Sequence, residues 1–271
     1  MHDYHMHTHY CRHATGGLAD YARAAREKGI TEICITPHIP LPGFTPGVFN
    51  DRVRMDIGEF GSYLEELERT RALFPDMTIL SGIEADFIEG REEQLAEFLS
   101  RHSFDLVLMS VHFVGGWPDG EWVFDFSLEG RTLARVYSDY FRSARKGIET
   151  GLFDCVAHLD LIKQPGRPVL ETNAAEVEGI LALCMERGMS VEINTSGTRK
   201  EIGEAYPSDD IVRLMIEHRV PLIVGSDAHA PSQVGQGFEE LFDRFGAAVE
   251  LLLVRYRGRR MVSGSSPLLA R

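Results

Sequence analysis

The sequence alternates regularly between short apolar runs and longer segments with helical periodicity, and this alternation restricts the fold more than any other feature. Strands that are apolar on both faces and separated by helices are typical of a parallel sheet. Seven such units predict either a closed α/β barrel or an open, doubly wound sheet. The expected strands lie within residues 2–7, 30–38, 77–87, 104–113, 153–158, 189–194 and 220–229, and the expected helices cover 18–29, 53–73, 92–101, 128–150, 173–188 and 208–219.

The ends of the expected strands favour the barrel, because six of the seven carry histidine, aspartate or glutamate as candidate ligands at or within three residues of the carboxyl end. The carboxyl ends of parallel strands form one face of a barrel, and active sites are built on that face. The remaining strand, 189–194, ends in Asn194, which is not a typical metal ligand. A lone strand-end histidine is ordinarily a structural, hydrogen-bonded residue. The joint placement at one end of six strands therefore indicates a multinuclear metal site.

The spacing of these residues also suits metal binding. His5 and His7 share one side of the first expected strand, because side chains alternate with period two. Asp227 and His229 repeat the spacing after the last strand, which lies beside the first strand in a closed barrel. One ion with an open position needs about three or four protein ligands, so the candidates fit two or three ions with a bridging carboxylate. The candidate ligands are His5, His7, His13, His38, Glu84, His112, His158, Asp227 and His229.

Composition excludes several classes of function. The chain has 271 residues and a net charge of −13, which argues against a broad grip on nucleic-acid phosphates. We find no apolar stretch long enough to span a membrane and no secretion signal, and the four scattered cysteines are typical of a cytoplasmic protein. No linker divides the chain, so we expect a single domain over residues 1–271. Residues 247–264 are expected to add a C-terminal β-hairpin.

Several motifs, in order along the chain, resemble the PHP (polymerase and histidinol phosphatase) family. They are HMHTHYCRH at 5–13, TPH at 36–38, GIEADF at 82–87, SVHF at 110–113, AHLD at 157–160, EINTSGTRK at 192–200 and GSDAH at 225–229. Within the family, the pair His5-Met6-His7 followed by Cys11-Arg12-His13 is most similar to the monofunctional histidinol-phosphate phosphatases of histidine biosynthesis. The resemblance runs from His5 to about Phe238.

The resemblance implies a distorted (β/α)7 barrel that holds up to three ions of zinc, iron or manganese. It implies hydrolysis of L-histidinol phosphate by a metal-bridging hydroxide with in-line attack. Carried over by position, the first ion is held by His5, His7, Glu84 and Asp227, the second by Glu84, His112 and His158, and the third by His13, His38 and His229.

Three alternatives have different consequences. Another PHP phosphoesterase, acting on protein-tyrosine, nucleotide or cyclic phosphodiester substrates, shares the metal site and differs in the pocket. A non-catalytic PHP module is disfavoured by the complete ligand set. A metal-dependent amidohydrolase usually needs a metal-bridging lysine on a mid-barrel strand, where this chain has Glu84 and His112.

Residues for binding and proton transfer are less strongly indicated. Asp160 is the candidate acid or base, with orientation of a ligand histidine as the alternative. Arg199 is the candidate phosphate clamp and Lys163 the second choice, both against the alternative of a solvated surface cation. His9 either lines the pocket or only neighbours it, and Trp117 is a candidate cover for a ring-containing substrate. The expected partner is a small phosphorylated substrate, and the sequence leaves a homo-oligomer open.

Overall fold

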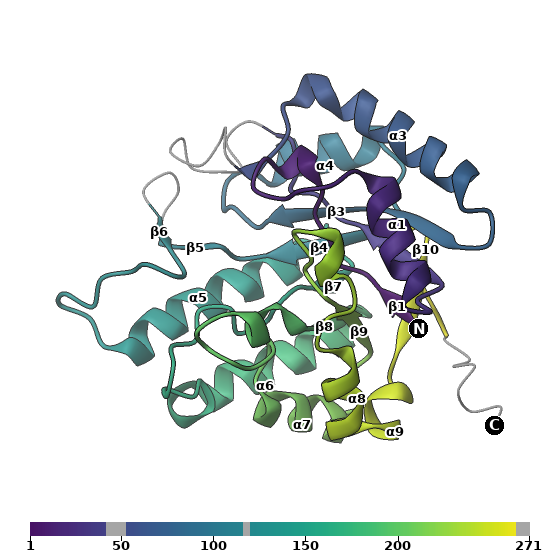
Figure 1. The fold of residues 1–271 in the computed structure, drawn as a ribbon. Helices are drawn as coiled ribbons and strands as arrows, with labels where there is room; N and C mark the ends of the chain where they lie inside the picture. The colour runs from purple at the N-terminus through teal and green to yellow at the C-terminus, as the bar shows by residue number, and fades with distance from the viewer. Residues whose placement is uncertain (42–52, 116–119, 264–271) are drawn as a thin grey trace.

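The computed structural model describes residues 1–41, 53–115 and 120–263 (Figure 1). Within these residues, seven parallel strands form one sheet in the order β1-β2-β3-β4-β7-β8-β9. Consecutive strands along the chain are therefore neighbours in the sheet, as the alternating pattern predicts. The strands are β1 (His2–Asp3), β2 (Glu32–Ile35), β3 (Thr78–Asp86), β4 (Leu106–Ser110), β7 (Cys155–Val156), β8 (Ser190–Asn194) and β9 (Leu222–Gly225).

The two edges of this sheet meet, so the strands form a nearly closed barrel. Just beyond β1, the Tyr4 N–H donates to the Val224 carbonyl of β9 at 3.0 Å. Two residues after that donor, Met6 and Ala228 form a parallel bridge. These contacts confirm the distorted seven-stranded barrel and exclude the open, doubly wound alternative.

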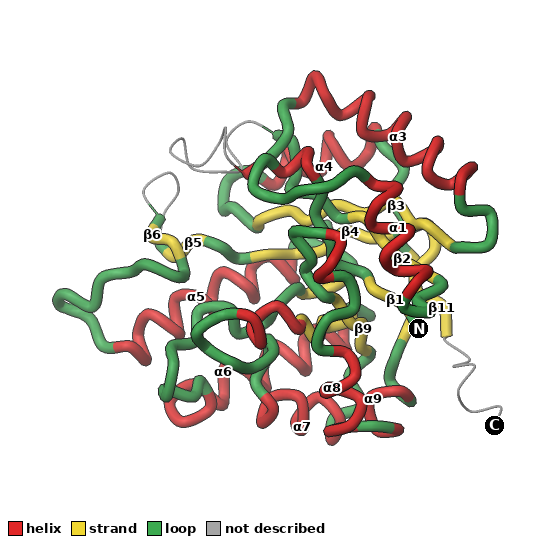
Figure 2. The backbone as a smooth tube through the Cα atoms, in the orientation of Figure 1, coloured by secondary structure: helices red, strands yellow, loops and turns green. Residues whose placement is uncertain are grey.

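Helices surround the strands, and Figure 2 shows the yellow strands in the middle of the molecule with red helices outside them. In α1, the buried residues Leu18, Tyr21, Ala22 and Ala25 recur at helical spacing and pack into the core. The helices are α1 (Leu18–Glu27), α3 (Phe60–Leu73), α4 (Glu92–Arg101), α5 (Leu133–Glu149), α6 (Leu170–Arg187), α7 (Asp209–Glu217), α8 (Phe238–Phe245) and α9 (Ala247–Glu250). No helix in the described part of the chain is both long and apolar enough to cross a membrane.

Some predicted boundaries were wrong. The helices predicted from residues 53, 128 and 173 begin at Phe60, Leu133 and Leu170. For α5 the reason is a cap, because the Thr132 side chain accepts a hydrogen bond from the N–H of Arg135. The strand predicted to reach residue 113 ends at Ser110. The next residues form a small antiparallel hairpin of β5 (Phe113–Val114) and β6 (Glu121–Trp122).

The C-terminal hairpin closes the barrel at the amino ends of its strands. It consists of β10 (Val254–Arg257) and β11 (Arg260–Ser263), whereas α9 replaces the beginning of the predicted strand segment. Tyr256 is buried against barrel residues that include Tyr4 and Leu108. Its hydroxyl lies 2.9 Å from Ser190 Oγ and donates to the Asp154 carbonyl at 2.8 Å. The hairpin leaves the carboxyl ends of the strands free for a site.

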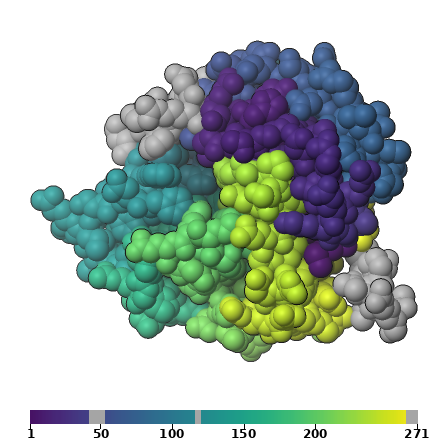
Figure 3. All heavy atoms as spheres, viewed as in Figure 1, coloured from purple at the N-terminus to yellow at the C-terminus, as the bar shows by residue number. Residues whose placement is uncertain are grey.

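Figure 3 shows a long-range neighbourhood that this closure creates on the surface, where the purple N-terminal segment lies against the yellow-green segment near residue 230. The N–H of Thr15 donates to the His229 carbonyl at 2.8 Å. The N-terminal histidines and the residues after β9 therefore belong to the same face.

Candidate metal centre

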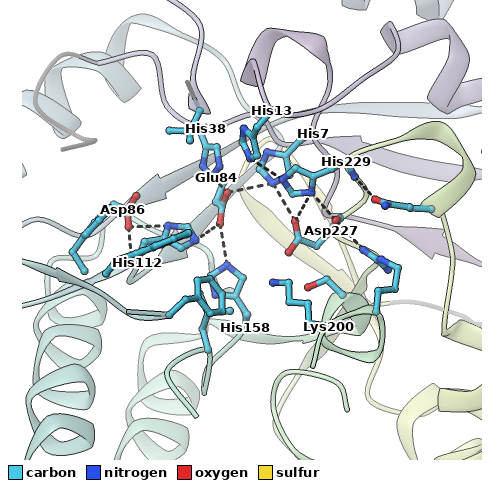
Figure 4. A pocket seen from close by; sticks show the side chains of 18 residues that line it. His7, His13, His38, Glu84, Asp86, His112, His158, Lys200, Asp227 and His229 are labelled. Atoms are coloured by element: carbon cyan, nitrogen blue, oxygen red, sulfur yellow. Dashed lines mark hydrogen bonds and ion pairs between the residues drawn. The ribbon is translucent and has the colours of Figure 1, made fainter. Parts of the chain in front are cut away.

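The side chains at the carboxyl ends of the strands converge on one small volume (Figure 4). His5 and His7 follow β1, Glu84 lies in β3, and His158 and Asp227 follow β7 and β9. His158 has φ 29° and Asp227 has φ 49°, a left-handed conformation that non-glycine residues rarely adopt. Such backbone strain clusters at functional sites, and these two strained residues lie just beyond the ends of β7 and β9.

The Glu84 carboxylate is the centre of the cluster and is 1% exposed. Its Oε1 accepts a 2.5 Å hydrogen bond from Ser110 Oγ. Five imidazoles also approach the carboxylate: His38 Nδ1 at 2.9 Å, His158 Nε2 at 3.0 Å, His7 Nε2 at 3.4 Å, and His5 Nε2 and His112 Nε2 at 3.6 Å. A buried carboxylate with this many nitrogen neighbours is suited to bridge cations.

The donor set fits metal ions. His5 Nε2 lies 3.2 Å from His7 Nε2, and His13 Nε2 lies 2.9 Å from His229 Nε2. Neutral imidazoles gain little from facing one another in this way unless a proton or a cation lies between them. Three groups each bring their ligand atoms within 4.8 Å of one another: His5, His7 and Glu84; His7, Asp227 and His229; and Glu84, His112 and His158.

The members of the predicted ligand sets lie close together. Asp227 Oδ1 lies 3.2 Å from His7 Nε2 and 3.7 Å from His5 Nε2. In the set predicted for a third ion, His13 faces His229, and the ring centre of His38 lies 5.4 Å from that of His13 while its Nδ1 faces Glu84. The structure thus brings all nine candidates into one cluster. Their roles as ligands stay a prediction.

Other residues hold the imidazoles in place, and the sequence analysis missed two of them. Glu192 Oε1 lies 2.8 Å from His5 Nδ1, and its Oε2 accepts from the His158 N–H at 2.9 Å. Asp86 Oδ1 lies 3.0 Å from His112 Nδ1. The alternation of side chains along a strand could have identified both carboxylates. Asp86 lies two residues after Glu84 and Glu192 lies two residues before Asn194, so each lies on the same side of its strand as a residue at the strand end.

Cys11 contacts three of the candidate ligands. Its Sγ lies 3.3 Å from His7 Nδ1 and accepts from the His38 N–H at 3.4 Å, while its carbonyl oxygen pairs with His13. Burial raises the pKa of the thiol to about 12, so Cys11 is a neutral positioning group. The Cys11-x-His13 spacing thereby links the N-terminal histidines to one another.

The charges in the cluster lower the pKa of the Glu84 carboxyl group and raise the pKa of the His112 imidazole. Burial alone raises the pKa of Glu84, but the imidazoles of His38, His5 and His112 outweigh it and hold that pKa well below its usual value. Burial lowers the pKa of His112, but the carboxylates of Asp86, Glu84 and Asp227 together outweigh burial and the pKa rises to about 9. The site therefore favours ionised carboxylates, which is the form that binds cations.

A cavity of about 700 Å³ opens above the cluster. Arg199 lines it: Nη2 donates to the carbonyls of Ser226 at 2.7 Å and Asp227 at 3.1 Å, while Nη1 is buried and has no hydrogen-bond partner within the described residues. The sequence analysis also missed Lys200, which lines the same cavity. Phe113, Trp122 and Phe124 give the cavity an aromatic wall.

Three other predicted residues lie outside this cavity lining. The Asp160 carboxylate is buried, accepts from the Ser208 N–H at 2.9 Å and pairs with Lys163 at 3.3 Å. Lys163 also pairs with Glu204 at 3.2 Å, so its charge is neutralised inside the protein. His9 is exposed and its Nδ1 faces the Gly16 carbonyl. Trp117 lies outside the described residues.

A comparison with protein families agrees with this geometry. The model described as "PHP domain" matches residues 3–196. The chain belongs to the PHP family. A second model, "PHP-associated", matches residues 210–260, which contain Asp227 and His229. The candidate centre therefore draws on both matched segments of this PHP chain.

Several relatives of this PHP chain carry a functional name. It is 34% identical over 239 residues to the "Probable histidinol-phosphatase" of Deinococcus radiodurans, covering 88% of this chain and 90% of the relative. It is 29% identical to the "Histidinol-phosphatase" of Bacillus subtilis, covering 89% and 98%. The solved histidinol phosphate phosphatase of Lactococcus lactis, in complex with zinc, L-histidinol and phosphate, has the same fold, with a TM-score of 0.77 at 18% identity over 97% of this chain and 98% of that one.

Proposed function

We propose that this protein is a metal-dependent phosphomonoesterase that hydrolyses L-histidinol phosphate to L-histidinol and phosphate. The observation that carries the proposal is the Glu84 carboxylate among five imidazoles, at the base of a cavity that Arg199 also lines. The Nη1 of Arg199 is buried and has no hydrogen-bond partner among the described residues. The relatives named histidinol-phosphatase support the choice of substrate.

The number of donors suits two or three ions. Imidazole and carboxylate ligands do not discriminate among zinc, iron and manganese, so the proposal includes all three metals. When bound, the ions supply a nucleophile at neutral pH and neutralise charge on the phosphoryl oxygens. The residues that would hold them are His5, His7, Glu84, His112, His158, Asp227 and His229, with His13 and His38 at the outer side of the cluster.

The chain itself orients these groups and the substrate. Glu192 and Asp86 fix the ring orientations of His5 and His112 through their Nδ1 atoms. Arg199 is held by two backbone carbonyls through Nη2, which leaves Nη1 to bind a phosphoryl oxygen. The aromatic wall of Phe113, Trp122 and Phe124 offers an apolar face against which the imidazole ring of histidinol would pack.

The two segments matched by family models form one domain in this proposal. Strand β9 belongs to the second segment, yet it pairs with β8 and donates its end to the site through Asp227. A truncated chain that lacks residues 210–260 would lose a wall of the barrel and part of the ligand cluster.

The test is phosphate release from L-histidinol phosphate by protein that has been stripped of metal and then reloaded with zinc, manganese or iron. We expect activity only after reloading, and a preference for this substrate over phosphotyrosine, nucleotide and cyclic phosphodiester substrates. Equal or better turnover of one of those substrates would instead assign the chain to another PHP phosphoesterase activity.

A further inference from the structure

Lys200 lines the same cavity as the imidazole cluster, and Figure 4 shows its side chain below Asp227 in that view. It directly follows Arg199 at the end of the short 3-10 helix Thr195–Arg199. Its Nζ lies 4.8 Å from the ring centre of Phe124 and 5.3 Å from that of Tyr206. Within the described residues, no carboxylate oxygen lies within 4 Å of this nitrogen.

A second lysine shows how different this environment is. Lys163 also follows a barrel strand, but its ammonium group pairs with the carboxylates of Asp160 and Glu204 and with the Ala205 carbonyl. The charge of Lys163 is therefore compensated inside the protein. Within the described residues, the ammonium group of Lys200 has no such ion pair and lies against two aromatic faces, which leaves its N–H donors available. The strongest acidic influence on its charge is the Asp227 carboxylate, which acts from a longer distance.

Such a cation suits the proposed substrate. A phosphate monoester carries between one and two negative charges near neutral pH, and Arg199 lines the same cavity with one positive charge. We infer that Lys200 is a second phosphate-binding cation, which contacts the phosphoryl oxygens together with Arg199. This inference rests on the proposed phosphomonoesterase function and names a residue that determines its specificity for phosphorylated substrates.

The test measures binding of inorganic phosphate to the metal-loaded protein by titration calorimetry. We expect Lys200→Met to raise the Kd for phosphate about tenfold, Arg199→Ala to raise it at least as much, and Lys200→Arg to restore part of the affinity. The matched control is Lys146→Met. This variant removes the positive charge of a lysine on α5 that pairs with Glu89. The control should leave the Kd unchanged, and all variants should unfold near the wild-type temperature.

Two further measurements separate phosphate binding from a structural role. Lys200→Met should raise KM for L-histidinol phosphate while leaving the affinity for L-histidinol, which has no phosphate, within twofold of wild type. A phosphate Kd for Lys200→Met within twofold of wild type would overturn the inference, as would a wild-type protein that binds no phosphate. Lys200-dependent phosphate binding without turnover of L-histidinol phosphate would support Lys200 and reject the proposed function.

Discussion

The two ends of the barrel both bury carboxylates, but they pair them with different cations. At the carboxyl ends of the strands, the basic groups paired with Glu84 and Asp227 among the described residues are imidazoles. At the amino ends, Glu32 accepts two bonds from Arg257 at 2.8 and 3.0 Å, and Asp154 pairs with Arg259 at 3.0 Å. The carboxyl end of the barrel therefore pairs its carboxylates with titratable imidazoles, and the amino end pairs them with permanently charged guanidinium groups.

This difference assigns separate tasks to the two ends. A guanidinium satisfies a carboxylate through two parallel bonds and leaves no coordination site. An imidazole offers a lone pair that a cation can share with the carboxylate. We therefore expect substitutions at the carboxyl end to change metal content and turnover with small effects on stability. Substitutions at the hairpin end should do the reverse.

The largest effect is expected for His158→Ala, which removes an imidazole 3.0 Å from the Glu84 carboxylate. Loss of one ligand should remove a metal ion and lower kcat by roughly a thousandfold or more, because the bound metals carry most of the charge stabilisation. Elemental analysis and phosphate release measure the two effects. Full metal content together with wild-type turnover would show that His158 is not a ligand.

Glu192→Gln should have a smaller effect at the same end. The variant keeps the shape of the side chain but removes the charge that orients His5 through its Nδ1. Loss of such a partner typically lowers metal affinity or activity by about 10–100-fold. Glu176→Gln, on the outer helix α6, serves as the control. If metal affinity and turnover of Glu192→Gln match those of the control, Glu192 has no positioning role.

The sequence predicted the carboxyl end better than its supporting contacts. The clustering of the candidate ligands at the strand ends was predictable because strand alternation and period two are local properties of the chain. The pairing of Glu192 with His5 depends on how the barrel closes, which joins residues 187 positions apart. The contact of His38 Nδ1 with Glu84 likewise depends on packing and not on residue spacing.

The two lysines show the same limit. Lys163 and Lys200 both follow strands in polar motifs, and the sequence analysis named Lys163 as the second choice for phosphate binding after Arg199 and did not name Lys200. In the structure, Lys163 turns toward Asp160, three residues earlier, while Lys200 points into the cavity. The local turn decides which way each side chain points, and residue spacing does not reveal that turn.

At the hairpin end, Tyr256→Phe should reduce stability without changing turnover. The hydroxyl donates to the Asp154 carbonyl and lies 2.9 Å from Ser190 Oγ, and both partners would lose a buried hydrogen bond. Such a loss costs about 1–3 kcal/mol of unfolding free energy. Chemical denaturation and steady-state kinetics measure the two quantities. A drop in kcat of more than a few-fold, with unchanged stability, would contradict the division of tasks between the ends.

Glu32→Gln tests the hairpin end through pH and should give the smallest effect. Burial alone raises the pKa of Glu32, but its bonds from Arg257 and Tyr4 outweigh burial and lower that pKa below 4.5. A lowered pKa in the folded state means that the ionised form stabilises the fold above about pH 4.5, and that this contribution disappears as the pH falls through the folded-state pKa. Denaturation of chelator-treated wild type and variant should therefore show a stability difference at pH 7 that shrinks on acidification. A difference that stays constant down to pH 3 would mean that the ion pair with Arg257 does not stabilise this end of the barrel.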